Sequence, residues 1–245
     1  MKKLMLTSIC FLLLKLSEGQ TQFYNTVKIE FEKTVNVHAY YKEVDEEWFS
    51  FIKDRWPKTV TSYHNFIGDS TRSIYKPGRE VAIDSRSGYR PVADKNVVYN
   101  DYSRRISIAQ KPVFEETFLV EDSLSKIKWK LTPDTRTIAG FECRKAIGIL
   151  DDSVAVFAFY TDELLVSGGP EGITGLPGMI LGVGVPRLHA TWFATKVEVS
   201  GISMSTVTPA TKGKKVSRAI MMSSLDKILR QWGKFGSKLI INFEI

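Results

Sequence analysis

The chain has 245 residues, of which 43% are hydrophobic and 25% are charged, and its formal net charge is +7. This length suits one domain with a sizeable hydrophobic core. Charges of both signs are mixed along the chain, and the densest basic run, KGKK at 212–215, is too short to indicate a nucleic-acid partner. We interpret this run as a solvated loop.

Residues 1–19 are typical of a secretory signal peptide. Lys2 and Lys3 precede an apolar run at 4–14, and the small residues Ser17 and Gly19 follow it. The run is shorter than the roughly 20 residues that a membrane-spanning helix needs, and no longer apolar run follows. We therefore expect cleavage after Gly19, no transmembrane span, and one β-rich domain over residues 20–245. The pattern therefore predicts export of the chain.

An alternation of apolar and polar residues dominates the remaining chain and predicts an antiparallel sheet, because most gaps are too short for helical crossovers. The stretch NTVKIEFEKTVNVHAYY predicts one long strand, with Lys28 and Glu30 outward. Four segments of this kind place the following residues inward: Val27, Ile29, Phe31, Val35 and Val37; Phe114, Phe118 and Val120; Ile127, Trp129 and Leu131; and Phe141, Cys143, Ile147 and Ile149. A fifth, HATWFATKVEVSGI, does the same for Phe193, Val197 and Val199, and SVAVFAFY, apolar on both faces, indicates a central strand.

Two segments have helical spacing instead. EVDEEWFSFIKDRW predicts an amphipathic helix near 44–56 that ends before Pro57. SSLDKILRQWGKFG predicts a C-terminal helix near 224–235, with Ser223 or Ser224 as its cap. The expected fold is therefore mainly β (α+β): one curved antiparallel sheet, like half of a barrel, with these helices against it.

The stretch GPEGITGLPGMILGVGVP at 169–186 is unusually rich in glycine and proline. It lacks the spacing and the lysine of a phosphate-binding loop, and a strand follows it rather than a helix. Pro177 and Gly178 suit the centre of a type II turn. Gly182 and Gly184 leave one strand face without side chains, which either allows the sheet to bend or lets a ligand approach.

The sequence GLPGMIL at 175–181 resembles the signature of the GLPGLI family of secreted proteins from Bacteroidota, with Met179 in place of a leucine. The resemblance extends to WKLT at 129–132, TIAGFECRKA at 137–146, FYTDELLVSGGPE at 159–171 and FATKVEV at 193–199. It implies a location in the cell envelope, either in the periplasm or associated with the outer membrane or secreted, and no established enzymatic activity. A curved sheet closed by helices is also similar to periplasmic lipoprotein carriers, whose concave face holds acyl chains.

We therefore expect a non-catalytic protein that binds a hydrophobic or amphipathic ligand, or an outer-membrane protein partner, without a cofactor. Its five tryptophans fill one core or partly line a groove. The candidate ligand-binding residues are Gly175, Leu176, Pro177, Gly178, Met179, Gly182, Gly184, Arg187 and Trp192.

A metal-binding or redox protein is the alternative. Removal of the expected signal leaves Cys143 as the one cysteine, so no internal disulfide is expected. A thiolate paired with the imidazole of His189 would suit a metal or redox site. No hydrolase or metalloprotease motif accompanies them, and a buried thiol is the other interpretation of Cys143.

Overall fold

The computed structural model describes residues 23–81, 91–150 and 154–245. The expected signal peptide lies outside the described residues. The residues within these ranges form twelve strands: β1 (Thr26–Asn36), β2 (Thr59–Asp69), β3 (Arg72–Pro77), β4 (Val97–Asp101), β5 (Ile106–Val113), β6 (Glu116–Ser123), β7 (Lys130–Ile138), β8 (Phe141–Leu150), β9 (Val154–Thr161), β10 (Met179–Val185), β11 (Ala190–Glu198) and β12 (Lys214–Val216). The α-helices are α1 (Val37–Val44), α2 (Glu46–Ile52), α3 (Arg218–Leu229), α4 (Gly233–Leu239) and α5 (Ile241–Glu244).

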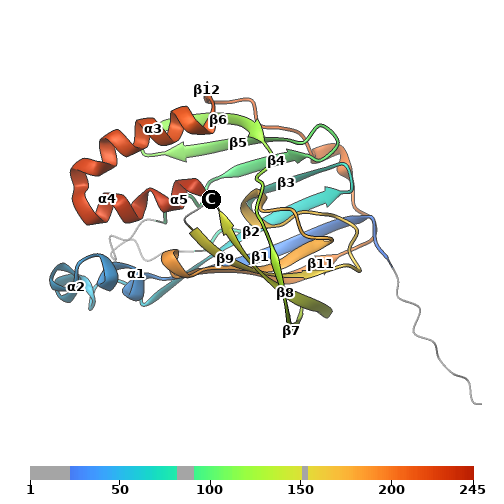
Figure 1. Ribbon diagram of the computed structural model, residues 1–245, viewed down its shortest axis with the longest axis horizontal. Helices are drawn as coiled ribbons and strands as arrows, with labels where there is room; N and C mark the ends of the chain where they lie inside the picture. The colour runs from blue at the N-terminus through green and yellow to red at the C-terminus, as the bar shows by residue number, and fades with distance from the viewer. Residues whose placement is uncertain (1–22, 82–90, 151–153) are drawn as a thin grey trace, which may run out of the picture.

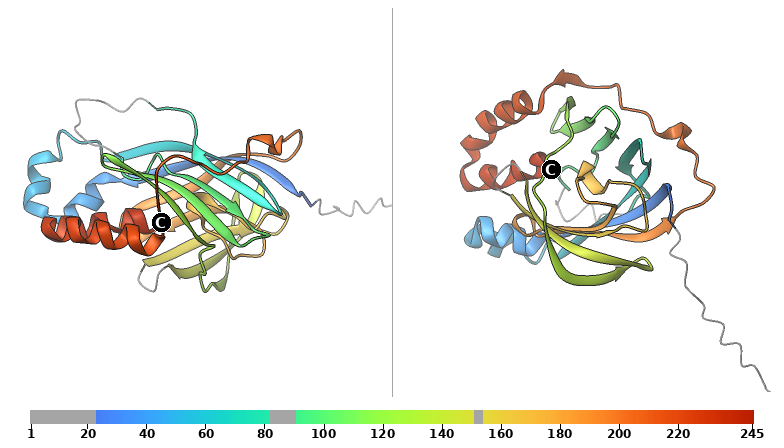
Figure 2. Two further views of the ribbon diagram at one scale, coloured as in Figure 1. Left: turned by 90° about the horizontal axis from the view of Figure 1, so that it is seen from above. Right: turned by 45° about the vertical axis from the view of Figure 1, so that its right-hand side comes forward.

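All twelve strands belong to one sheet, in the order β12-β6-β5-β4-β3-β2-β1-β11-β10-β9-β8-β7. The chain runs outward from β1 to β6, starts again at the opposite edge with β7, and returns through β11 to pair with β1. Neighbouring strands are antiparallel except for β12, which pairs with β6 in parallel. The sheet curls around its inner face, and α3 to α5 lie across its open side (Figures 1 and 2). The expected mainly-β, curled sheet with a C-terminal helix is confirmed.

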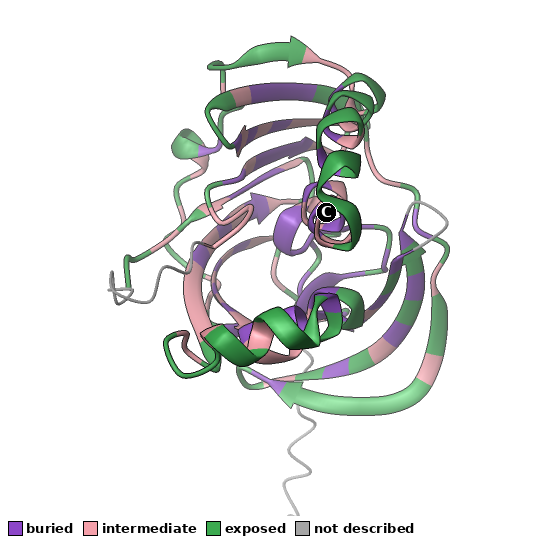
Figure 3. Cartoon of the chain, turned by 90° about the vertical axis from the view of Figure 1, so that its left-hand side faces the viewer, coloured by how far each residue is buried: buried purple, intermediate pink, exposed green. Residues whose placement is uncertain are grey.

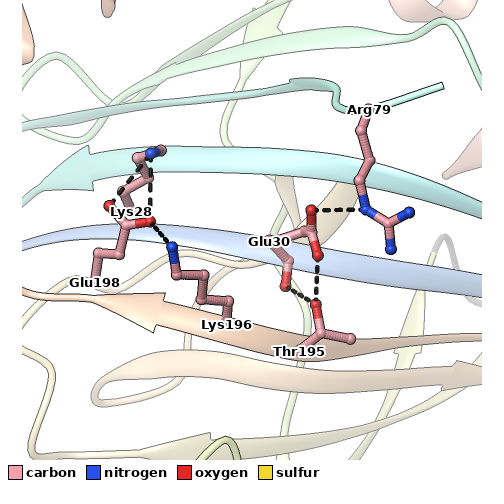
Figure 4. A network of polar contacts seen from close by, with 6 residues as sticks. All are labelled: Lys28, Glu30, Arg79, Thr195, Lys196 and Glu198. Atoms are coloured by element: carbon pink, nitrogen blue, oxygen red, sulfur yellow. Dashed lines mark hydrogen bonds and ion pairs between the residues drawn. The ribbon is translucent and has the colours of Figure 1, made fainter.

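Strand β1 shows how alternation builds the core. Val27, Ile29 and Phe31 have no exposed surface. Their neighbours Lys28 and Glu30 point to the outer face, where Lys28 pairs with Glu198 of β11 at 3.2 Å (Figure 4). Buried residues are accordingly concentrated along the strands and near the end of the chain, whereas the longer helices expose much of their surface (Figure 3).

Several expected inward positions are wrong. In β8 the expectation holds for Cys143, but Ile147 and Ile149 are 43% and 56% exposed. The buried positions there are Ala146, Gly148 and Leu150, because Ile127 and Trp129 pack over Gly148. Leu131 and Phe114 are exposed too, the latter in the β5–β6 turn with a positive φ. In β11 the buried residues are Ala190, Trp192 and Ala194. The expected Phe193 and Val197 are half-buried, as is Val199 just after the strand.

The first helical region begins earlier than expected and is divided in two. The stretch expected as the end of a long strand forms α1 from Val37, capped by the Asn36 side chain, which accepts a hydrogen bond from the Ala39 amide at 3.0 Å. The extended backbone of Asp45 separates α1 from α2, and its carboxylate caps α2 through the Trp48 amide at 2.8 Å. The expected single helix over 44–56 is therefore two short helices over 37–52.

The C-terminal helix also begins before its expected start. Ser217 is its cap, because its hydroxyl accepts a hydrogen bond from the Ile220 amide, so Ser223 and Ser224 lie inside α3. Helix α4 then turns back against α3. The basic run at 212–215, expected as a solvated loop, contributes two exposed lysines to β12. No helix of the described ranges is long and apolar enough to cross a bilayer.

The glycine-rich strand β10 is buried along its whole length. An added Cβ at Gly184 would lie 1.9 Å from the Phe157 ring, and one at Gly182 would lie 2.6 Å from the Phe193 ring. The side-chain-free face is therefore covered by two aromatic rings. Pro177 and Gly178 form a tight bend in which the Gly178 amide donates to the Leu176 carbonyl at 2.9 Å, a three-residue turn rather than the expected type II turn.

Candidate functional site

The main cavity of the described structure has a volume of about 550 Å³. It lies between β4, β5 and β6 on one side and the end of β8, the short turn Pro170–Gly172 and α3 on the other. This volume falls within the range of about 300–1,000 Å³ that is usual for small-molecule sites. The curl of the sheet creates this space, because it brings strands β4 to β6 opposite the end of β8.

The floor of the cavity is apolar. Alternation in β4, β5 and β6 turns apolar side chains toward the cavity, namely Val98, Ala109 and Val120. Helix α3 and β8 supply the opposite wall. The further apolar lining residues are Leu124, Ile149, Leu150, Ile173, Met221 and Ile245.

Charged side chains of both signs line the cavity beside this floor. The cations Lys126 and Lys128, in the segment between β6 and β7, are exposed. Arg218, at the start of α3, donates a hydrogen bond to the Glu244 carbonyl. Lys111 is buried deeper and donates to the Phe243 carbonyl at 3.0 Å. The acidic lining residues are Asp122, Glu171 and Glu244. An apolar floor with two exposed lysines at its rim suits a ligand with an apolar body and an anionic group.

Glu171 forms part of the inner wall. Only 9% of this residue is exposed, and its Oε2 accepts a hydrogen bond from the side-chain amide (Nδ2) of Asn96 at 3.2 Å. Its backbone has a φ of +54°, in the left-handed region that non-glycine residues rarely adopt. Glu171 also lines a second, smaller cavity of about 30 Å³, so it stands between the two.

The candidate ligand-binding residues are spread over several places. None of the nine lines the 550 Å³ cavity, and Trp192 lines the 30 Å³ cavity. Leu176 and Met179 are buried in the core, and Arg187 is exposed in a short turn after β10. Ligand contact by this group of residues stays a prediction. Of the five tryptophans only Trp192 is fully buried, and Trp48 and Trp232 are both more than 40% exposed.

The alternative site at Cys143 and His189 gains no support. Burial raises the pKa of the Cys143 thiol to about 12, so the thiol is protonated at neutral pH. The Nε2 atom of His189 lies 2.6 Å from a carboxylate oxygen of Glu43. Among the residues that the structure describes, no group of three or more His, Cys, Asp or Glu residues could hold a metal ion.

Sequence reasoning missed Lys111 and Glu171. Lys111 stands at an inward position of β5, two residues from Ala109 and two from Val113, so a lysine in the apolar phase of a strand was the available signal. Glu171 lies inside the glycine-rich stretch that was singled out, but nothing in that pattern shows that its side chain turns inward. The left-handed backbone that aims it is a property of the folded chain.

Comparison with known proteins gives a family for this architecture. The family model described as "N-glycanase peptide, N-terminal domain" matches residues 89–218. Two structures of PNGF-II, in space groups P21 and C2, share 16% and 15% identity with 86% of this chain at a TM-score of 0.52. Likeness at this identity shows the fold alone.

The chain spans only 34% and 33% of the length of those two PNGF-II chains. No curated protein matches. Membership of the GLPGLI family is not shown by these comparisons. Because the family model covers more than half of the sequence, the chain belongs to the N-glycanase peptide N-terminal domain family.

Proposed function

We propose that this chain is an exported, non-catalytic binding domain that holds an amphipathic, anionic ligand in its 550 Å³ cavity. The observation that carries the proposal is the combination, in one cavity, of an apolar floor with the exposed lysines Lys126 and Lys128 at its rim. Export rests on the signal-like pattern of residues 1–19. In this proposal the apolar part of the ligand lies in the cavity, and not against the glycine-rich stretch at 169–186 as the sequence suggested.

Both parts of the cavity contribute to affinity in this proposal. Each methylene of the ligand that leaves water for the floor contributes about 0.8 kcal/mol. An acidic head at the exposed rim lysines adds a smaller, salt-dependent attraction. Affinity should therefore rise with chain length at constant head group and fall as salt is added.

Family membership supports a binding role but does not supply an activity. The family model is named as an N-terminal domain, and this chain corresponds to about a third of PNGF-II. A domain that forms only part of such a protein suits the binding of a ligand beside other domains. The Cys143 thiol is poorly suited to bind a metal, because burial raises its pKa to about 12 and keeps it protonated at neutral pH.

The test is calorimetric titration of the chain from residue 20 onward with dodecanoate and octanoate below their micelle concentrations. We expect saturable binding of dodecanoate and weaker binding of octanoate. The double variant Lys126→Gln/Lys128→Gln should bind dodecanoate about threefold to tenfold more weakly. The matched control Lys212→Gln/Lys215→Gln removes two exposed lysines that do not line the cavity, and should bind like the parent.

Absence of saturable dodecanoate binding would overturn the proposal. An equal loss of affinity in both double variants would refute a direct role of Lys126 and Lys128 in binding, since the change in net charge alone would then explain the effect. Release of an outer-membrane protein rather than a small amphiphile from the chain isolated from its own cells would replace the small ligand by a protein partner.

A further inference from the structure

A second polar cluster lies inside the curled sheet, behind the inner wall of the main cavity. We call it the inner polar site; it consists of Lys33, His64, Tyr75, Asp94, Glu171 and Trp192. These residues come from β1, β2, β3, the segment before β4, the turn Pro170–Gly172 and β11. Lys33, Asp94, Glu171 and Trp192 line the 30 Å³ cavity. Separate parts of the chain therefore bring polar side chains to one buried place.

One pair in this site already satisfies itself. The Nζ atom of Lys33 lies 2.6 Å from Oδ1 of Asp94. Burial alone would lower the pKa of Lys33, but the charges of Asp94 and Glu171 outweigh burial and raise it. Burial also lowers the pKa of His64, so this ring is neutral near pH 7. With one lysine and two carboxylates, the site then carries an excess of negative charge.

Four buried polar atoms of the site make no close hydrogen bond to the described residues: Nδ1 of His64, the hydroxyl of Tyr75, Oε1 of Glu171 and Nε1 of Trp192. The Tyr75 hydroxyl still lies near enough to Trp192 and Glu171 to interact weakly with both. Nε2 of His64 lies 3.1 Å from the Asp94 carbonyl and must donate to it, which leaves Nδ1 as an acceptor. A buried polar atom without a good partner costs about 1–3 kcal/mol, so a cluster of such poorly satisfied atoms favours the entry of a further polar group.

Glu171 borders both this site and the main cavity. Its charge acts on Lys33, His64 and Tyr75, so its carboxylate lies close to the inner polar site as well. The left-handed backbone at Glu171 holds the carboxylate in this wall at a conformational cost. Strain of this kind at a buried carboxylate is characteristic of ligand-binding segments.

We infer that Glu171 binds a hydrogen-bond-donating group, a hydroxyl or an ammonium, at the inner end of the ligand held in the main cavity. This inference rests on the proposed function and narrows its ligand class. The ligand is then polar at both ends: its acidic group lies at the rim lysines, its apolar body covers the floor, and its inner end donates to Oε1 of Glu171. The negative excess of the site favours a donor over a second anion.

Three probes with the same apolar body and the same carboxylate test this inference: dodecanoate, 12-hydroxydodecanoate and 12-aminododecanoate. In a purely apolar cavity, a polar end group weakens binding, because it loses its hydration without gaining a partner. With Glu171 at the inner end, the hydroxy and amino probes should bind about tenfold more tightly than dodecanoate. The sign of the difference therefore separates the two cases.

The Glu171→Gln variant removes the charge but keeps the size of the side chain. We expect it to lose the preference for the amino probe and to keep part of the preference for the hydroxy probe, since the amide oxygen still accepts. Glu142→Gln, at an exposed carboxylate of β8 outside both cavities, is the matched control and should retain both preferences. The parent chain alone tests the sign if Glu171→Gln does not fold.

Equal or weaker binding of the two polar-ended probes, with dodecanoate still bound, would overturn this inference and leave the proposed function standing. An unchanged preference in folded Glu171→Gln would overturn the role of Glu171. If none of the three probes binds, the proposed function fails and the inference fails with it.

Discussion

Replacement of Lys33 by methionine should lower the free energy of unfolding by about 3–5 kcal/mol, because it leaves the Asp94 carboxylate without its buried counter-charge. The two side chains are only 6% and 18% exposed, and Nζ lies 2.6 Å from Oδ1. At that separation, two unit charges attract by about 6 kcal/mol in an effective dielectric of about 20. Methionine has nearly the length of the lysine stem, so little of the cost comes from a cavity.

Lys28 supplies a matched control on the same strand. It pairs with Glu198 at 3.2 Å on the outer face, where the side chains are 43% and 34% exposed. Exposed pairs of this kind contribute about 0–1 kcal/mol, so Lys28→Met should have little effect. The double variant Lys33→Met/Asp94→Asn should recover much of the loss, because no buried charge is then left alone. Urea unfolding followed by tryptophan fluorescence measures all four chains.

The Lys33–Asp94 pair also determines the direction in which acid changes the free energy of unfolding. Burial alone would raise the pKa of Asp94, but the charge of Lys33 outweighs burial and lowers it. A carboxylate with a folded pKa below its unfolded value of about 3.9 stabilises the fold above that pH, and the contribution is lost as the pH falls through the folded pKa. Asp94→Asn should reduce this acid-linked loss. A cost of Lys33→Met no larger than that of Lys28→Met would refute the reasoning.

Three further variants or reactions test other parts of the structure. Gly184→Ala should destabilise the fold by at least about 2 kcal/mol in urea unfolding, since the added carbon would lie 1.9 Å from the Phe157 ring; a neutral result would mean that the ring does not cover β10. Ser217→Ala should cost about 1 kcal/mol and Ser223→Ala less than about 0.5 kcal/mol, and the reverse order would place the start of α3 at Ser223. A disulfide reagent at pH 8 should modify Cys143 about a hundredfold more slowly in the folded chain than in urea, whereas equal rates would contradict its burial and its raised pKa.

Alternation predicted the fold well where one face of a strand meets the core and the other meets water. In β1 the contrast between Ile29 and Lys28 follows the pleat directly. The same reasoning failed for Ile147 and Ile149, because a segment distant in space decides which face of β8 is inside. A strand that carries large apolar side chains at one parity can still bury the other when tryptophan and isoleucine pack over a glycine.

The candidate site was harder to predict, because its residues contradict the local pattern. Lys33 and Lys111 occupy inward strand positions at which the pattern expects apolar residues. Their burial is compensated by partners far away in sequence: Asp94 for the first and the carbonyl of Phe243 for the second. Period-two analysis finds the strand but treats such a lysine as an irregularity. A charged residue in the apolar phase of a strand is therefore itself a sign of a buried polar site.

The two borders of the sheet protect the chain from pairing with a second copy of itself. At one border, the three residues of β12 pair with the backbone of β6, and two of these three residues are exposed lysines. At the other border, the register of β7 shifts between Leu131 and Thr135, a stretch that contains Pro133, which has no amide hydrogen to donate. Charge, irregularity and proline are the usual means by which sheet proteins avoid cross-chain hydrogen bonding. A curled sheet that does not close into a barrel can therefore keep two free edges without becoming a template for aggregation.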